Sequence, residues 1–95
     1  MRTKRKRVLE MDYTLEGSVY NRIAAIRAER GLERSTVADA VGISPQQLGY
    51  IEHKRIVPSL ELALRLSAYL MVPMEQLFGL QPFPSPEHER TFKLL

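Results

Sequence analysis

The sequence predicts an all-α domain of five short helices, with a possible short strand at each terminus. Apolar residues recur at three- and four-residue spacing between residues 19 and 78. Serine, proline and glycine stand where such segments would begin and end. The 95 residues suffice for one domain with a modest core, which we place at residues 18–80. A basic arm with the first strand (1–17) would precede it, and a proline-rich spacer and tail (81–95) would follow.

The composition narrows the class of protein. Hydrophobic residues make up 44% and charged residues 26% of the chain, as in ordinary globular domains. The absence of cysteine excludes disulfides, zinc-thiolate sites and thiol nucleophiles. No apolar run approaches the roughly 18 residues of a membrane helix, and no apolar segment follows the basic N-terminus as in a secretory signal. We therefore expect a cytoplasmic protein with no membrane partner.

The N-terminal segment holds much of the net charge of +3. Residues 1–17 contain five basic and three acidic groups, whereas residues 18–80 contain seven and six, so net charge alone argues only weakly for a nucleic-acid partner. The basic run is either a solvated tail or an arm that contacts DNA. From Leu9 to Leu15 apolar and polar residues then alternate, which predicts a half-buried strand. The candidate arm residues are Arg2, Lys4, Arg5, Lys6 and Arg7.

The first two helices are defined by their faces and by the glycines that follow them. The first should run from about Ser18, a plausible N-cap, to Arg30, and Gly31 should end it. The second should cover about Arg34 to Val41, with Gly42 as its stop. The residues expected on the buried faces are Val19, Ile23 and Ile26 in the first helix and Val37, Ala38 and Val41 in the second.

The third helix has the sharpest start in the chain. Ser44 is its N-cap and Pro45 its first residue, where a missing N–H costs nothing. Gln47, three residues after the serine, completes a Ser-x-x-Gln capping box. Leu48 and Ile51 give this helix its buried face.

Two further helices and the tail complete the chain. Ser59 should cap a fourth helix over 60–70, and a short fifth helix should open at Pro73, run through Phe78 and stop at Gly79. The residues expected to point inward from the fourth helix are Leu60, Ala63, Leu66 and Leu70. Prolines at 82, 84 and 86 predict an extended spacer, and alternation at the end of the chain allows a second short strand there.

Polar residues on the third helix are the candidates for function. The start of such a helix can enter the DNA major groove, where glutamine can bond bidentately to adenine. Gln46, Gln47 and Tyr50 would make base contacts, and Gly49 suits close approach of a backbone; alternatively, these are solvated polar residues on an exposed face. Helix N-termini and a basic loop would bind phosphate, unless the loop is an ordinary basic surface. The candidate phosphate contacts are Arg34, Ser35, Ser44, His53, Lys54 and Arg55.

Two other groups of residues suggest a structural ion pair and a metal motif, and only the ion pair is supported by the surrounding sequence. Arg27 and Glu52 each follow a buried position of their helix, so they could form a largely buried ion pair. The pair His88-Glu89 suggests a zinc protease, but Phe92 stands where the second histidine would be needed. With two histidines and no cysteine we expect no metal and no other cofactor, and nothing in the sequence indicates an enzyme.

From Ile23 to Phe78 the chain resembles the Cro and phage-repressor helix-turn-helix family, also called the xenobiotic-response-element type. The resemblance implies a five-helix, lambda-repressor-like DNA-binding domain that binds a palindromic operator as a dimer. It also implies Gln46 as the leading base-reading residue. The family's usual Thr-Gln opening of the second helix is Glu33-Arg34 here, and two customary glycines are Lys54 and Met71. The matching positions are Ile23, Ile26, Arg27, Gly31, Leu32, Val37, Ala38, Val41, Gly42, Ile43, Ser44, Leu48, Ile51, Glu52, Pro58, Ser59, Leu60, Leu66, Val72, Leu77 and Phe78.

The sequence leaves three functions open. The leading hypothesis is a sequence-specific DNA-binding transcriptional regulator, which we expect to be a repressor. It would act as a homodimer on double-stranded DNA and would be nucleoid-associated when DNA-bound. A second is an antitoxin whose termini bind a toxin protein and whose helix-turn-helix autoregulates. A third is a protein-interaction adaptor that does not bind DNA. For the dimer we expect the strand at 9–15 and the segment 91–95 to pair in a small sheet, within or between protomers.

Overall fold

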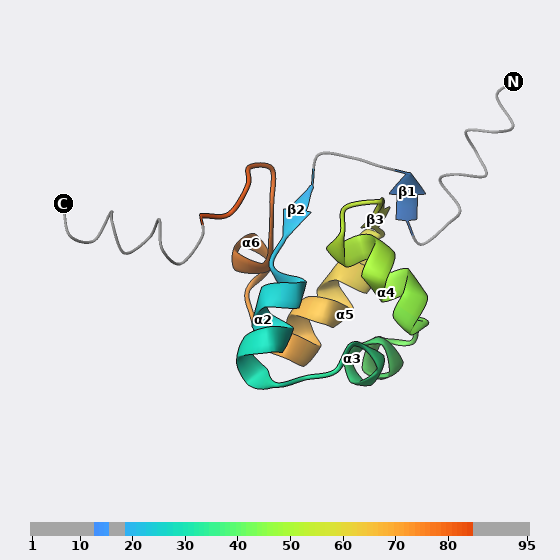
Figure 1. Cartoon of the computed structure of the whole chain (residues 1–95). Helices are drawn as coiled ribbons and strands as arrows, with labels where there is room; N and C mark the ends of the chain where they lie inside the picture. Colours follow the sequence, from blue (N-terminus) through green and yellow to red (C-terminus); the bar gives the residue numbers. More distant parts are fainter. Residues whose placement is uncertain (1–12, 16–18, 85–95) are drawn as a thin grey trace, which may run out of the picture.

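The computed structural model describes residues 13–15 and 19–84, and in this part of the chain five helices form one bundle (Figure 1). Helix α5 passes through the middle of the view, with α2 and α6 on one side and α3 and α4 on the other. Among the described residues, none of the helices has the length and apolar composition that a membrane-spanning helix requires. The helices are α2 (Ile23–Arg30), α3 (Arg34–Val41), α4 (Pro45–Glu52), α5 (Leu60–Leu70) and α6 (Met74–Leu77).

The core is built from apolar side chains that every helix contributes. Ile23 of α2, Val37 of α3, Leu48 of α4, Leu66 of α5 and Leu77 of α6 are all fully buried. Burying one such side chain stabilises the fold by about 1.5–3 kcal/mol. The prediction of five helices is therefore confirmed. Helices this short are marginally stable in isolation, so their mutual packing stabilises them.

The buried face of α5 differs from the prediction at its first turn. Leu60 was expected to point inward, but it is 69% exposed, and Leu62 is buried instead. Ala63 and Leu66 were correctly placed on the inner face, as was Leu70. Because successive helical residues turn by about 100°, a face centred on these residues leaves Leu60 pointing outward. Leu60 also follows the cap directly, before the helix has turned toward the core.

Local signals set the ends of the central helices. The hydroxyl oxygen of Ser44 accepts the backbone N–H of Gln47 at 3.0 Å, and that of Ser59 accepts the N–H of Leu62 at 3.1 Å. Gly42, with φ of 83°, ends α3 in the left-handed conformation that a side chain would disfavour. The predicted bounds of α3 and α5, and the start of α4, match the structure.

Two residues other than glycine occupy the left-handed region. Lys54, after α4, has φ of 64°, and Met71, after α5, has φ of 57°. These are the positions where the resemblance led us to expect glycine. A left-handed L-residue costs about 1–2 kcal/mol relative to its right-handed form. The chain thus keeps the left-handed backbone conformation at both turns, although the side chains of Lys54 and Met71 disfavour it.

The first and last helices are shorter than predicted. Helix α2 begins at Ile23 rather than Ser18, because Tyr20–Asn21 form strand β2, which pairs antiparallel with β4 (Phe78–Gly79). The side-chain oxygen of Asn21 accepts the N–H of Ile23 at 3.0 Å, so the helix starts there. For the same reason α6 stops before Phe78, which the prediction had placed in the helix. Val19, expected on the helical face, lies before β2 and is half-buried.

The predicted N-terminal strand is present, with a partner that the sequence did not indicate. Strand β1 (Tyr13–Leu15) pairs antiparallel with β3 (Ile56–Pro58), with Thr14 opposite Val57. The expected partner, residues 91–95, lies outside the described residues, as do the basic arm and residues 9–12. A proline at the end of β3 is compatible with a two-stranded ladder, which leaves one edge of each strand unpaired.

Candidate nucleic-acid interface

The turn between α3 and α4 aims the start of α4 away from the core. Val41 is buried at the end of α3, and Leu48 and Ile51 hold α4 against the same core. Between the two helices the chain turns through Gly42 in the left-handed region and Ser44 in the extended region. The first turn of α4 consequently carries its polar side chains on the outer surface.

The structure brings two of the three predicted base-contact residues together. Gln46 and Tyr50 are both exposed, one helical turn apart on α4. The side-chain amide of Gln46 donates a hydrogen bond from Nε2 to Oη of Tyr50, at 2.8 Å. Gln47 is half-buried beside them, and its backbone N–H is held by the Ser44 cap. Gln46 and Tyr50 are therefore the polar residues of α4 that are exposed.

This pair lines a shallow hollow of about 310 Å³. His53 closes one side of it, with its ring Nδ1–H donating to the backbone oxygen of Gly49 at 2.8 Å. The guanidinium carbon of Arg55 lies 5.8 Å from the centre of the Tyr50 ring, in cation–π range. Two arginines and a histidine thus border exposed amide and hydroxyl groups. The lining residues are Arg34, Gln46, Gly49, Tyr50, His53 and Arg55.

The remaining phosphate candidates lie apart from this hollow. The ammonium nitrogen of Lys54 sits 3.6 Å above the Tyr20 ring, so the lysine packs against β2. Ser35 borders a different hollow, beside Asp39 and Pro45. Ser44 is exposed, but its hydroxyl already caps α4. Of the six predicted phosphate contacts, the structure gathers Arg34, His53 and Arg55 around Gln46 and Tyr50.

A buried carboxylate fixes the frame behind the hollow. The side chain of Glu52 is 1% exposed, and its Oε2 lies 2.6 Å from Nε of Arg27, the pair that the sequence suggested. Its Oε1 accepts from Nη2 of Arg27 at 3.1 Å and from Nε of Arg34 at 3.2 Å. Arg27 also donates to the backbone oxygen of Leu32 at 3.0 Å. One carboxylate therefore ties α2, α3 and α4 together through two arginines.

Arg34 has a second constraint, at Gly49. A Cβ atom on this buried glycine would lie 3.2 Å from Nη1 of Arg34, so the arginine passes closely over the α4 backbone. The side chain of Arg34 remains 40% exposed. The absence of a side chain at Gly49 thus leaves room for the guanidinium between Glu52 and the surface. The sequence indicated Arg34 as a phosphate contact, but it did not indicate that the side chain crosses α4 at Gly49.

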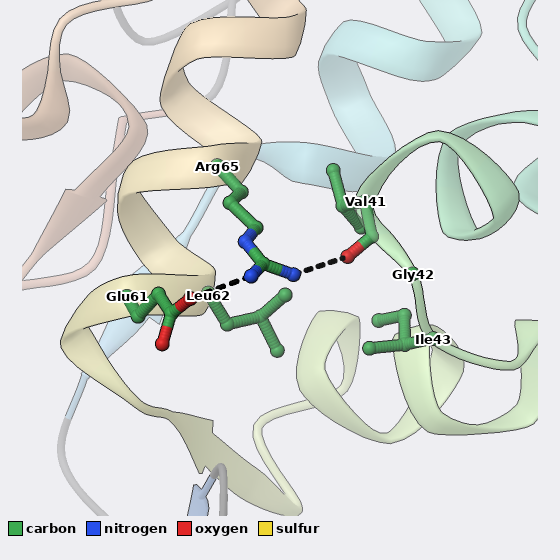
Figure 2. A pocket seen from close by; sticks show the side chains of 6 residues that line it. All are labelled: Val41, Gly42, Ile43, Glu61, Leu62 and Arg65. Atoms are coloured by element: carbon green, nitrogen blue, oxygen red, sulfur yellow. Dashed lines mark hydrogen bonds and ion pairs between the residues drawn. The ribbon is translucent and has the colours of Figure 1, made fainter.

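Three residues make supporting contacts between elements that the sequence did not indicate. Arg65 of α5 donates to the backbone oxygen of Val41 at 3.5 Å and to Glu61 at 2.5 Å, beside a small hollow that borders the α3–α4 turn (Figure 2). Arg30 likewise donates to the oxygen of Leu70, at the end of α5, at 2.5 Å. Asn21 donates to the oxygen of Ile51 at 2.9 Å. Arg30 and Arg65 thus place cationic side chains at the C-terminal ends of other helices, where the helix dipole favours them, and a local sequence pattern does not reveal such contacts.

Within residues 13–15 and 19–84 no group of three or more histidine, cysteine, aspartate or glutamate side chains is placed to hold a metal ion. His88 and Glu89, which suggested a metal motif, lie outside the described residues, as do the arm residues between Arg2 and Arg7.

Comparisons with known proteins agree with this geometry. The family model described as helix-turn-helix matches residues 23–77. The chain is 33% identical over 61 residues to the uncharacterized HTH-type transcriptional regulator YgzD of Bacillus subtilis (strain 168), covering 64% of this chain and 92% of that protein. It also resembles a crystal structure described as a candidate DNA-binding protein from Bacteroides fragilis, with a TM-score of 0.59 and 24% identity. That match covers 64% of this chain and 98% of the other and supports the fold alone.

Proposed function

Because this chain belongs to the helix-turn-helix family of the Cro/phage-repressor type, whose members are DNA-binding transcription regulators, we propose that it represses transcription by reading the major groove with α4. The observation that carries the proposal is the exposed Gln46–Tyr50 pair inside a rim of cationic side chains. An α-helix fits the major groove, and amide and hydroxyl groups on its first turns reach the base edges there.

The cationic rim supplies the phosphate contacts in this proposal. Arg34 and Arg55 flank the reading helix, and the dipole of α4 adds a partial positive charge at its N-terminal end. Phosphate contacts position a protein on the duplex, whereas base contacts carry the sequence information. Since the described domain is almost neutral, these local groups rather than net charge would bind the backbone. The basic arm at residues 2–7 would add a salt-sensitive contact of its own.

We include a homodimer in the proposal. A single module of this size covers only about 600–1,000 Å² of DNA, and helix-turn-helix dimers read half-sites about 34 Å apart. Helix α5 offers an apolar outer face, since Leu60 is 69% and Leu64 is 49% exposed. Glu61 and Arg65 lie one turn apart beside it, so a two-fold antiparallel contact would set each opposite its unlike charge on a second copy. Sedimentation of Leu64→Glu should show monomers; an unchanged dimer would exclude this face.

Selection from a random duplex pool at about 150 mM salt tests the function. The wild-type chain should enrich an inverted repeat, and Gln46→Ala should lose or relax the preference at one base pair of each half-site. Tyr69→Phe, on α5 and away from the hollow, is the control that should enrich the same inverted repeat. Enrichment of the same sequence by Gln46→Ala would rule out base reading by this residue.

Other outcomes of this selection would argue against sequence reading by α4. Salt-sensitive binding without sequence preference would identify the basic arm as the main DNA contact. Absence of DNA binding would favour the adaptor. The antitoxin alternative depends on the terminal segments, of which residues 13–15 and 81–84 are described. In the second of these, the centre of the Phe83 ring lies 5.6 Å from the guanidinium carbon of Arg22.

A further inference from the structure

The hydrogen bond between Gln46 and Tyr50 suggests a division of labour within the reading surface. We propose that Tyr50 is a positioning residue that fixes the amide of Gln46 for adenine, so that each half-site carries an A·T pair opposite Gln46. This proposal rests on the proposed function and deepens it, because it names the base and a second residue that determines the preference. Tyr50 acts in it through Gln46, across the 2.8 Å contact between Nε2 and Oη.

The donors and acceptors of the pair decide which base fits. A glutamine amide has two N–H donors and one oxygen acceptor. With one N–H given to Tyr50, the second N–H and Oε1 remain for the groove. Adenine presents an N7 acceptor and an N6–H donor there, which match this remaining set. Guanine presents two acceptors, N7 and O6, so Oε1 would face O6 without a proton between them. The bound amide therefore accepts adenine and rejects guanine.

The tyrosine is itself held in place, which makes it suitable as a support. Arg55 lies over its ring at 5.8 Å, and Gly49 and His53 border the same hollow. Glutamine has several rotamers of similar energy on a helix surface, and a preference between bases is weakened when the reading group must first be ordered. A ring anchored between the helix and the basic loop removes part of that freedom. The phosphate-binding loop and the base-reading amide are thereby linked through Tyr50.

Tyr50→Phe removes the hydroxyl while keeping the ring and its contact with Arg55. The chain offers a matched control in Tyr69→Phe, since Tyr69 is also 41% exposed but lies on α5. The probes are the duplex selected by the wild-type chain and three versions of it, changed to each other base pair at the position identified with Gln46→Ala. Dissociation constants are measured for each variant across a range of salt, after circular dichroism has shown that each is folded.

Tyr50→Phe should reduce the preference for adenine at that position by about 3- to 10-fold, the usual range for one lost neutral hydrogen bond. Preferences at the other positions and the salt dependence should match the wild-type chain, and Tyr69→Phe should change none of these quantities. An unchanged adenine preference in Tyr50→Phe would overturn the positioning role. So would an equal loss of affinity for all four duplexes, because that is the signature of a phosphate contact. A wild-type chain that prefers no sequence would instead overturn the proposed function, and this inference with it.

Discussion

Replacing Glu52 by alanine should strongly destabilise the fold. The substitution removes a carboxylate that is 1% exposed and leaves Arg27, 16% exposed, with only the Leu32 backbone oxygen as a partner. Removing one partner of a buried ion pair costs about 3–5 kcal/mol. Because Arg27 keeps some access to water and Arg34 is 40% exposed, we expect the lower end, about 3 kcal/mol. For a domain of this size such a loss lowers the melting temperature by about 12–24 °C.

Urea denaturation followed by circular dichroism measures this difference, with thermal melting as the second readout. The matched control is Glu61→Ala, since Glu61 forms the ion pair with Arg65 in which both side chains are exposed, at 72% and 56%. An exposed i,i+4 pair contributes about 0.3–0.5 kcal/mol, so this variant should stay within about 0.5 kcal/mol of the wild-type chain. If Glu52→Ala lost less than about 1 kcal/mol, the reasoning that one buried carboxylate ties three helices together would be refuted.

Three further substitutions test the local arguments by urea denaturation. Met71→Gly should stabilise the fold by about 1 kcal/mol, since it relieves a left-handed residue that is 84% exposed; a loss would contradict the strain. Ser44→Ala should cost about 1 kcal/mol through the missing N-cap, and an unchanged midpoint would show the cap to be dispensable. Leu62→Ala should lower the free energy of unfolding by about 2–5 kcal/mol, and Leu60→Ala by less than about 1 kcal/mol. The reverse order would show that Leu60 is the buried residue, as the sequence predicted.

The elements that the sequence predicted well are those with signals inside a few residues. Gly42 defines the end of α3, and Ser44 and Pro45 define the start of α4, without reference to the rest of the chain. Ser59 does the same for the start of α5. The start of the first helix was predicted too early in the chain because Tyr20 pairs with Gly79, which is far away in the sequence. Pairing of such short strands depends on tertiary packing, which overrides the helical pattern of a local window.

The candidate site was predictable at the level of helix position. Spacing on α4 was enough to select Gln46 and Tyr50, and the adjacency of Arg27 and Glu52 to buried residues suggested their ion pair. The sequence did not show that Arg34 shares this carboxylate, because its path over Gly49 depends on side-chain conformation. Nor did it show Arg65 bracing the end of α3, since that contact joins different helices.

The central claim is that α4 reads a DNA sequence, and a specificity ratio tests it most directly. The measurement compares the dissociation constants for the selected duplex and for a scrambled duplex of equal length and composition, at about 150 mM salt. We predict that the selected duplex binds at least about 1,000-fold more tightly, as specific sites generally do. Equal dissociation constants, both rising steeply with salt, would contradict base reading by α4 and leave only phosphate binding.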